Sequence, residues 1–181
     1  MGCLSLKHYI NHHAADGHLL KLLADNFLKM TLDLHQHNIS HGDLQHQNIF
    51  VTDEGFIKLI DYDSICIPEL EGQPDICLGT QGYQHPSRYT AGFFSSTKMD
   101  YFSELIIYIS ILAVSENPLL WEKYDVMTAD YRLLFKLDDF YSFDISDLRR
   151  DLMLLSSDVQ TLVKKLDIYL AAHLLLTPIA G

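Results

Sequence analysis

The 181-residue sequence contains few cysteines and no apolar run long enough to cross a membrane. Its longest apolar stretch, residues 101–114, is interrupted by polar residues and is shorter than the roughly 20 residues that a membrane-spanning helix needs. Three cysteines without C-x-x-C spacing indicate neither a disulfide framework nor a zinc ribbon. We therefore expect no membrane association. The same cysteine usage, without a charged-then-apolar leader, favours the cytoplasm.

Positive charge is also scarce. Lysine and arginine number 13 against 24 aspartates and glutamates, which gives a formal net charge of −11. No basic stripe is present, and acidic residues flank the pair Arg149-Arg150. Nucleic-acid backbones are bound by clustered lysines and arginines, so we exclude nucleic acid as a partner. The apolar share of 48% predicts a folded chain, and the length favours one domain spanning residues 1–181.

Hydrophobic periodicity predicts an α+β chain that is mainly α. The predicted helices cover residues 4–12, 18–37 and 101–114, with shorter helical pieces after Pro118 and a last helix opened by a capping-box pattern at Ser157-Asp158-Val159-Gln160. Residues 101–114 are apolar on nearly all sides, which predicts a buried helix. Residues 49–51 and 56–60 are predicted to form a small β-hairpin. Residues 61–97 are rich in proline and glycine and predict a long functional loop.

Two polar motifs lie on either side of the predicted hairpin. The first is His41-Gly42-Asp43-Leu44-Gln45-His46-Gln47-Asn48, and the second is Ile60-Asp61-Tyr62-Asp63. Because the hairpin turns the chain back, we expect Asp61 to lie beside Asn48. An aspartate, an amide and a second aspartate supply the base and the two metal ligands that phosphoryl transfer needs.

These motifs resemble the H-R-D-x-x-x-x-N catalytic loop and the D-F-G turn of protein kinases. Residues 79–86, Gly79-Thr80-Gln81-Gly82-Tyr83-Gln84-His85-Pro86, are similar to the G-T-x-x-Y-x-A-P end of a kinase activation segment. The order of the elements is that of the C-terminal lobe of the protein kinase-like fold. The resemblance covers essentially the whole chain and implies that residues 61–97 form an activation-segment-like loop.

The resemblance implies a site that uses ATP and Mg²⁺ to phosphorylate a hydroxyl group. Asp43 would be the base that orients the acceptor, while Asn48 and Asp61 would bind the metal. Thr80 would hydrogen-bond to Asp43, and Gln45 stands where Ser/Thr kinases place a lysine that contacts the γ-phosphate. Three further residues would line the nucleotide pocket, with Phe50 as its floor and Ile60 at its back: Gln47, Phe50 and Ile60. Asp100 matches the aspartate that holds the catalytic-loop backbone in kinases, and it is also a candidate helix cap.

The sequence departs from the kinase pattern at several positions. Gly42 replaces the arginine of H-R-D, so we expect the site to be ordered without phosphorylation of the loop. Asp63 replaces the glycine of D-F-G and is expected either to be an additional metal ligand or to cap the turn. Ser87 stands in place of the glutamate of A-P-E, so the usual ion pair under the segment must be rebuilt by other residues.

The forty residues before His41 contain neither G-x-G-x-x-G nor V-A-I-K, the motifs of the kinase N-terminal lobe. The sequence therefore predicts a fragment, a lobe completed by a partner, or a chain without catalysis. A fragment should expose apolar surface around Phe50 and Tyr62.

Two other functions stay open. Small-molecule phosphotransferases, such as aminoglycoside and choline kinases, also use H-G-D-x-x-x-x-N and I-D-x-D, so the acceptor is a hydroxyl of a protein or of a small molecule. The segment at residues 79–86 favours the protein-kinase-like branch. A pseudokinase that serves as a scaffold would explain the missing Gly-rich loop and lysine. The ten histidines lack the spacing of a zinc site.

Overall fold

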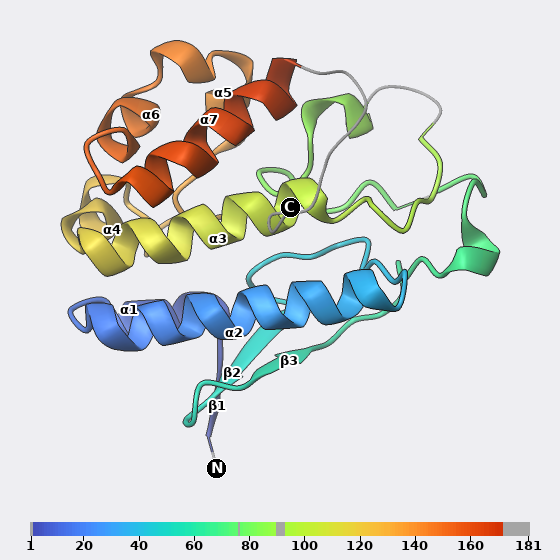
Figure 1. Cartoon of the computed structure of the whole chain (residues 1–181), viewed down its shortest axis with the longest axis horizontal. Coiled ribbons are helices and arrows are strands. Elements are labelled where there is room, and N and C mark those ends of the chain that lie inside the picture. Colours follow the sequence, from blue (N-terminus) through green and yellow to red (C-terminus); the bar gives the residue numbers. More distant parts are fainter. Residues whose placement is uncertain (1, 76, 90–92, 172–181) are drawn as a thin grey trace.

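The computed structural model of the chain describes residues 2–75, 77–89 and 93–171. The helices and strands follow in the order β1 (Cys3–Ser5), α1 (Leu6–His13), α2 (Gly17–Gln36), β2 (Ile49–Thr52), β3 (Ile57–Leu59), η1 (Pro68–Leu70), η2 (Pro86–Tyr89), α3 (Tyr101–Glu116), α4 (Leu119–Lys123), α5 (Leu137–Tyr141), η3 (Phe143–Ile145), α6 (Asp147–Leu152) and α7 (Ser157–Ala171). Figure 1 shows α2 and α3 side by side, with the strands on one side of this pair and α4 to α7 on the other. The predicted class, α+β and mainly α, is confirmed.

Helix α3 is the centre of the hydrophobic core. Twelve of its sixteen residues are buried, because α2 packs on one side of it and α7 on another. From α2, the apolar residues Leu20, Leu23, Ala24 and Phe27 are fully buried. A fully buried leucine or phenylalanine side chain contributes about 1.5–3 kcal/mol to stability. The prediction of a helix buried on nearly all sides is confirmed.

The sheet contains one strand that the sequence did not predict. Cys3–Ser5 pairs antiparallel with β2, with Leu4 opposite Val51, and β2 pairs antiparallel with β3. The predicted hairpin is therefore part of a three-stranded sheet. The first helix begins at Leu6 rather than at Leu4, because the residues before it use their backbone groups in the sheet.

The last helix is capped one residue earlier than predicted. The Ser156 hydroxyl accepts a hydrogen bond from the Val159 N–H at 3.4 Å, and the Gln160 side chain donates to the Leu155 carbonyl at 2.9 Å. The capping box at Ser157 is therefore wrong, although the helix itself is correct. Within the described ranges, no helix combines the length and the hydrophobicity that crossing a membrane requires.

Candidate active site

Asp100, which precedes α3, anchors the loop that carries the first motif. Its buried carboxylate accepts hydrogen bonds from the backbone N–H of His41 and, at 3.0 Å, from that of Gly42. Burial raises the pKa of Asp100, and these hydrogen bonds oppose the shift. The expected grip on the loop is confirmed. Asp100 also stands at the expected N-cap position of α3, but its carboxylate makes no cap hydrogen bond there.

The loop at residues 41–48 is in direct contact with the turn at residues 61–64, which carries Asp61 and Asp63. Ser40 and Cys66 exchange two backbone hydrogen bonds of 3.0 and 2.9 Å. The His41 ring nitrogen Nε2 lies 2.8 Å from the Ile60 carbonyl oxygen. Gly42 has a φ of +84°, and a Cβ at this position would lie 2.0 Å from the Ser64 carbonyl oxygen. Glycine is therefore required here, because any other residue would push the turn away.

Asp43 is held by the residues that the sequence predicted around it. Its Oδ1 accepts from the Thr80 N–H at 2.7 Å, and its Oδ2 lies 3.3 Å from the Thr80 hydroxyl. The predicted hydrogen bond between Thr80 and Asp43 is confirmed. The Asn48 side-chain amide donates to the Asp43 carbonyl at 2.9 Å, with the Asp43 Oδ2 at 3.5 Å. Thr80, from a distant part of the sequence, thus fixes the carboxylate, and Asn48 fixes the backbone of Asp43 within the same loop.

The backbone brings Asp61 to the same place. The Ile60 N–H donates to the Asn48 carbonyl at 3.0 Å, so Asp61 follows directly after a residue paired with Asn48. Asp61 is exposed and has a φ of +65°, which is unusual for a residue other than glycine. Among the described residues no group donates to its carboxylate, and the Asn48 Oδ1 is likewise left without a donor. These two groups offer oxygen atoms to a hard cation.

The other predicted site residues have the following places. Gln45 is buried and its Oε1 accepts from the Gln47 N–H at 2.8 Å, whereas Gln47 is exposed. Phe50 is half-buried on β2, and Ile60 is 44% exposed. Asp63 is exposed in the turn after Asp61. In the described part of the chain, no three His, Cys, Asp or Glu side chains gather in a way that could hold a metal ion. A metal at this site would therefore need the Asn48 amide.

His46, for which we predicted no role, is a buried part of the loop. Its Nδ1 lies 2.6 Å from the Tyr83 hydroxyl, and its Nε2 lies 3.0 Å from the Asp130 carbonyl oxygen. Burial, with the nearby Lys7 charge, lowers the pKa of His46 to about 4, so the ring is neutral at pH 7. Burial also raises the pKa of Tyr83 well above its usual value. The pair connects the loop at residues 41–48 to residues 79–86.

A second unpredicted pair links α2 to α3 close to the anchor. His35 Nε2 lies 2.9 Å and 3.0 Å from the two carboxylate oxygens of Glu104. Glu104 is fully buried one helical turn after Asp100. Burial raises the pKa of Glu104 to about 6, against the hydrogen bond from His35. Nothing in the helical spacing marked either residue, because both lie within apolar patterns.

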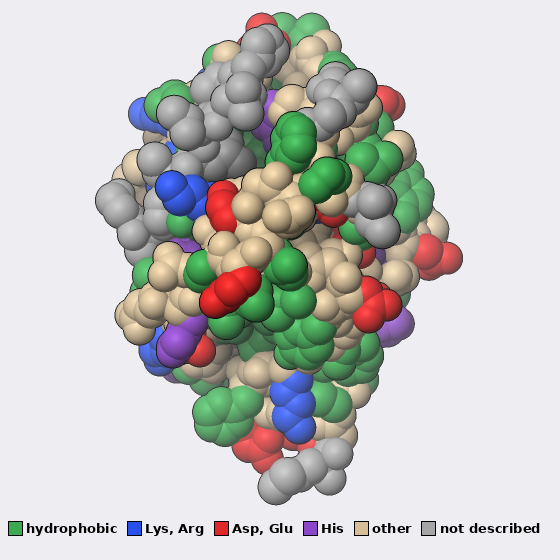
Figure 2. Space-filling model, turned by 90° about the vertical axis from the view of Figure 1, so that its right-hand side faces the viewer, with side chains coloured by type: hydrophobic (Ala, Val, Ile, Leu, Met, Phe, Trp, Pro, Cys, Tyr) green, Lys and Arg blue, Asp and Glu red, His purple; other side chains and the backbone are tan. Residues whose placement is uncertain are grey.

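The face beside the two motifs is apolar in its middle and poor in basic residues. Figure 2, which looks onto the side that carries residues 61–75, shows hydrophobic side chains with several carboxylates around them and few lysines or arginines. On either side of Asp61, Tyr62 is 52% and Ile60 is 44% exposed. The predicted exposed apolar surface around Phe50 and Tyr62 is present.

Comparisons with known proteins point to one family. The family model of the protein kinase domain matches residues 1–168. The serine/threonine-protein kinase PSK2 of Saccharomyces cerevisiae is 28% identical over 101 residues, which are 56% of this chain and 9% of that protein. A probable serine/threonine-protein kinase, HAL5-like, of Vanderwaltozyma polyspora is 25% identical over 138 residues, 68% of this chain and 18% of that protein. A cGMP-dependent protein kinase of Toxoplasma gondii is 36% identical over 53 residues, 29% of this chain and 5% of that protein. The chain thus spans less than a fifth of each of these relatives.

Proposed function

The chain belongs to the protein kinase domain family, and we propose that it is the catalytic-loop lobe of an ATP- and Mg²⁺-dependent phosphotransferase that acts on a protein serine or threonine. The observation that carries this proposal is the fixed Asp43 carboxylate, held by Thr80 and next to the Asn48 amide. A carboxylate in this position can accept a hydrogen bond from the acceptor hydroxyl and take its proton as the oxygen attacks phosphorus.

The donor set next to Asp43 fits a magnesium ion. Mg²⁺ is commonly bound through one or two carboxylates together with substrate phosphates and water. Asn48 Oδ1 and the Asp61 carboxylate would be the protein ligands, because their other hydrogen bonds leave these oxygens available. When bound, the ion neutralises charge on the nucleotide phosphates. The positive φ of Asp61 supports a functional role, because strained backbone is often retained at active sites.

The remaining residues have supporting roles in the proposal. Phe50 and Ile60 offer partly exposed apolar surface for the adenine, and Gln47 lies at the open edge of the loop. Gln45 organises the loop through its bond to the Gln47 N–H and cannot neutralise charge as a lysine would. Asp63 is exposed and free to become an additional ligand. The site would be completed by a Gly-rich lobe in the same protein or in a partner. The three cysteines are unpaired, which supports a reducing compartment such as the cytoplasm.

The experiment measures phosphate transfer from ATP to a peptide. It uses the chain together with the Gly-rich lobe that completes the site. Replacing Asp43 with alanine should lower kcat by roughly a hundredfold or more while ATP binding persists, because general-base assistance is lost. Replacing Asp61 with alanine should weaken Mg²⁺-dependent ATP binding as well. Asp33→Asn, at a largely exposed carboxylate on α2, is the control and should leave both unchanged. Normal transfer by both site variants would refute the proposal.

Two outcomes would select the alternative functions. A small-molecule phosphotransferase would transfer phosphate to a sugar or amino alcohol and not to peptides. A scaffold would show no magnesium-dependent heat of ATP binding in calorimetry. The segment at residues 79–86 favours the peptide acceptor, because the family positions its substrate there.

A further inference from the structure

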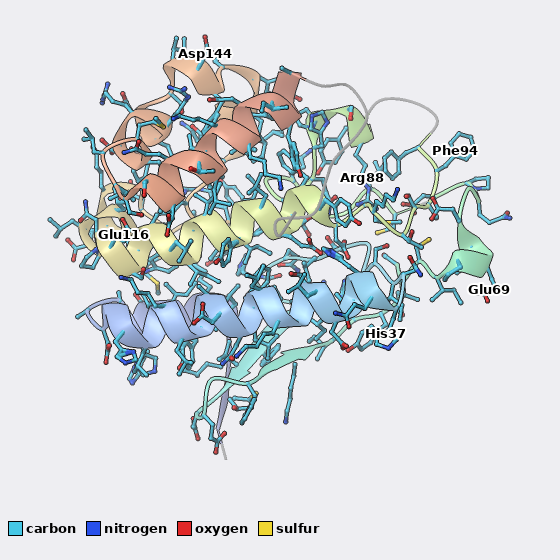
Figure 3. The ribbon with its side chains drawn as sticks, viewed as in Figure 1. His37, Glu69, Arg88, Phe94, Glu116 and Asp144 are labelled. Carbon is cyan, nitrogen blue, oxygen red and sulfur yellow. The ribbon has the colours of Figure 1, made fainter. Side chains whose placement is uncertain are left out.

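Arg88 is a buried cation near the start of α3, on the side of the molecule that carries residues 61–97 (Figure 3). Only 2% of it is exposed. Its Nη2 donates to Asp75 Oδ2 at 2.9 Å and to the Cys77 carbonyl at 3.0 Å, and its Nη1 donates to Gln84 Oε1 at 2.5 Å. A buried guanidinium must be paired in this way, because it has lost its water.

The contacts of Arg88 lie on both sides of Thr80 in the sequence. Asp75 and Cys77 precede Thr80, and Gln84 follows it. Asp75 also accepts from the Cys77 N–H at 2.9 Å, so its carboxylate holds both the guanidinium and the backbone that precedes Thr80. The planar fork of an arginine suits such a junction, since it presents several donors in fixed directions. Arg88 therefore closes the turn that presents Thr80 to Asp43.

A continuous set of contacts runs from Arg88 to the Asp43 carboxylate. The Gln84 side chain packs directly on Gly79, where a Cβ would lie 2.6 Å from Gln84 Nε2. Gly79 has a φ of +66°. The next N–H in the chain is that of Thr80, which bonds Asp43 Oδ1 at 2.7 Å. A shift of the guanidinium would thus move Gln84, and with it the backbone that orients Asp43.

The surroundings of Arg88 hold it in place. The two ends of the segment at residues 61–97 pair through their backbones. The Gly72 N–H donates to the Ser95 carbonyl, and the Ser95 N–H donates to the Gln73 carbonyl, each at 2.8 Å. The guanidinium lies 4.9 Å from the centre of the Phe93 ring and donates to the Met99 sulfur at 3.4 Å. Met99 directly precedes Asp100, which anchors the catalytic loop. The start of α3 therefore supports both residues 61–97 and the catalytic loop.

We propose that Arg88, paired with Asp75, is a positioning residue that keeps Thr80 bonded to the base Asp43. This role depends on the proposed function only in naming Asp43 as the base. It also accounts for two departures from the kinase pattern, the loss of arginine at Gly42 and of glutamate at Ser87. Asp75 and Arg88 rebuild inside the segment the ion pair that Ser87 cannot form, and Arg88 supplies a cation that Gly42 does not.

Hydrogen exchange of the Thr80 amide tests this role on the chain itself. Arg88→Lys keeps the charge but removes the fork, and Asp75→Asn keeps the shape but removes the charge. Each should speed exchange at Thr80 by about tenfold or more, while the Ile60 amide, bonded to Asn48, stays within about twofold. Arg149→Lys is the matched control, because Arg149 makes a similar forked pair with Asp167 far from Asp43, and it should change neither amide.

Unchanged exchange at Thr80 in Asp75→Asn, or an equal rise at Ile60, would overturn the role, and this holds even if Arg88→Lys fails to fold. The second measurement is the kinetics of phosphate transfer by the chain together with its Gly-rich lobe. Asp75→Asn should lower kcat about tenfold and leave the KM for ATP within about twofold, because it disturbs the base and not the nucleotide. An unchanged kcat would overturn the role. If the parent protein transfers no phosphate, the proposed function fails, whereas the exchange result still decides the role of Arg88 in holding Thr80.

Discussion

Replacing Gly42 with alanine should separate the loop at residues 41–48 from the turn at residues 61–64. The new residue would have to keep a φ of +84°, which costs about 1–2 kcal/mol for a residue with a Cβ. Its Cβ would also lie 2.0 Å from the Ser64 carbonyl oxygen and 2.8 Å from the Ser64 Cβ. Relief of this overlap requires the turn to move, and that motion strains the two backbone hydrogen bonds between Ser40 and Cys66. Each lost bond adds about 1 kcal/mol.

The expected loss for Gly42→Ala is therefore about 3–4 kcal/mol in the free energy of unfolding, a large part of the 5–15 kcal/mol of an ordinary protein. Gly72→Ala is the matched control. Gly72 has a similar φ of +78°, but no atom lies within 4 Å of its Cβ position, so only the backbone cost of about 1–2 kcal/mol applies. Urea unfolding of both variants measures the difference. A loss for Gly42→Ala that equals the loss for Gly72→Ala would show that contact with the turn does not require glycine.

Three further variants test the groups around the loop. Because its folded pKa is about 6, Glu104 binds a proton more readily in the folded chain than in the unfolded chain. Its contribution of about 2 kcal/mol to the free energy of unfolding is therefore complete below pH 4.5 and is lost as the pH rises through 6. Glu104→Gln should remove this pH dependence, measured by urea unfolding at several pH values. His46, with its folded pKa of about 4, has the opposite sign: up to about 3 kcal/mol is lost as the pH falls from 6.5 to 4, and a His46→Gln variant that kept this acid loss would contradict the assignment. Asp100→Asn should lower the free energy of unfolding by about 2 kcal/mol and speed exchange of the His41 and Gly42 amides, because an amide oxygen is a weaker acceptor than a carboxylate; unchanged exchange would count against the anchor.

Local sequence patterns were sufficient for the helices and for the two strands of the hairpin. The spacing of Leu20, Leu23 and Phe27 on α2, and the apolar character of 101–114, follow from burial on one face or on all faces. Strand β1 was beyond reach, because three residues carry no periodicity and its formation depends on β2, nearly fifty residues away. The cap of α7 was displaced by one residue because Ser156 and Ser157 are adjacent and equally suited to the position.

The residues of the site also fall into those that the sequence predicted and those that it did not. Asp43 and its bond to Thr80 followed from motifs, since a motif records which side chains meet. His46 and Glu104 did not, because their chemistry comes from burial and from partners in other elements. A histidine in a polar loop has the sequence appearance of a surface residue. Its lowered pKa comes from burial in the fold and from the nearby Lys7 charge, against the hydrogen bond to the Asp130 carbonyl.

Gly42 and Arg88 are two consequences of one arrangement. A glycine at position 42 lets the turn at residues 61–64 lie directly on the loop at residues 41–48, and that contact leaves no room for a side chain there. A cation that anchors the segment must then come from elsewhere. Arg88 reaches the same region from the far end of the segment, buried beside Met99 and paired with Asp75. The sequence shows the loss at position 42, but the replacement is visible only once the two ends of the segment are paired in space.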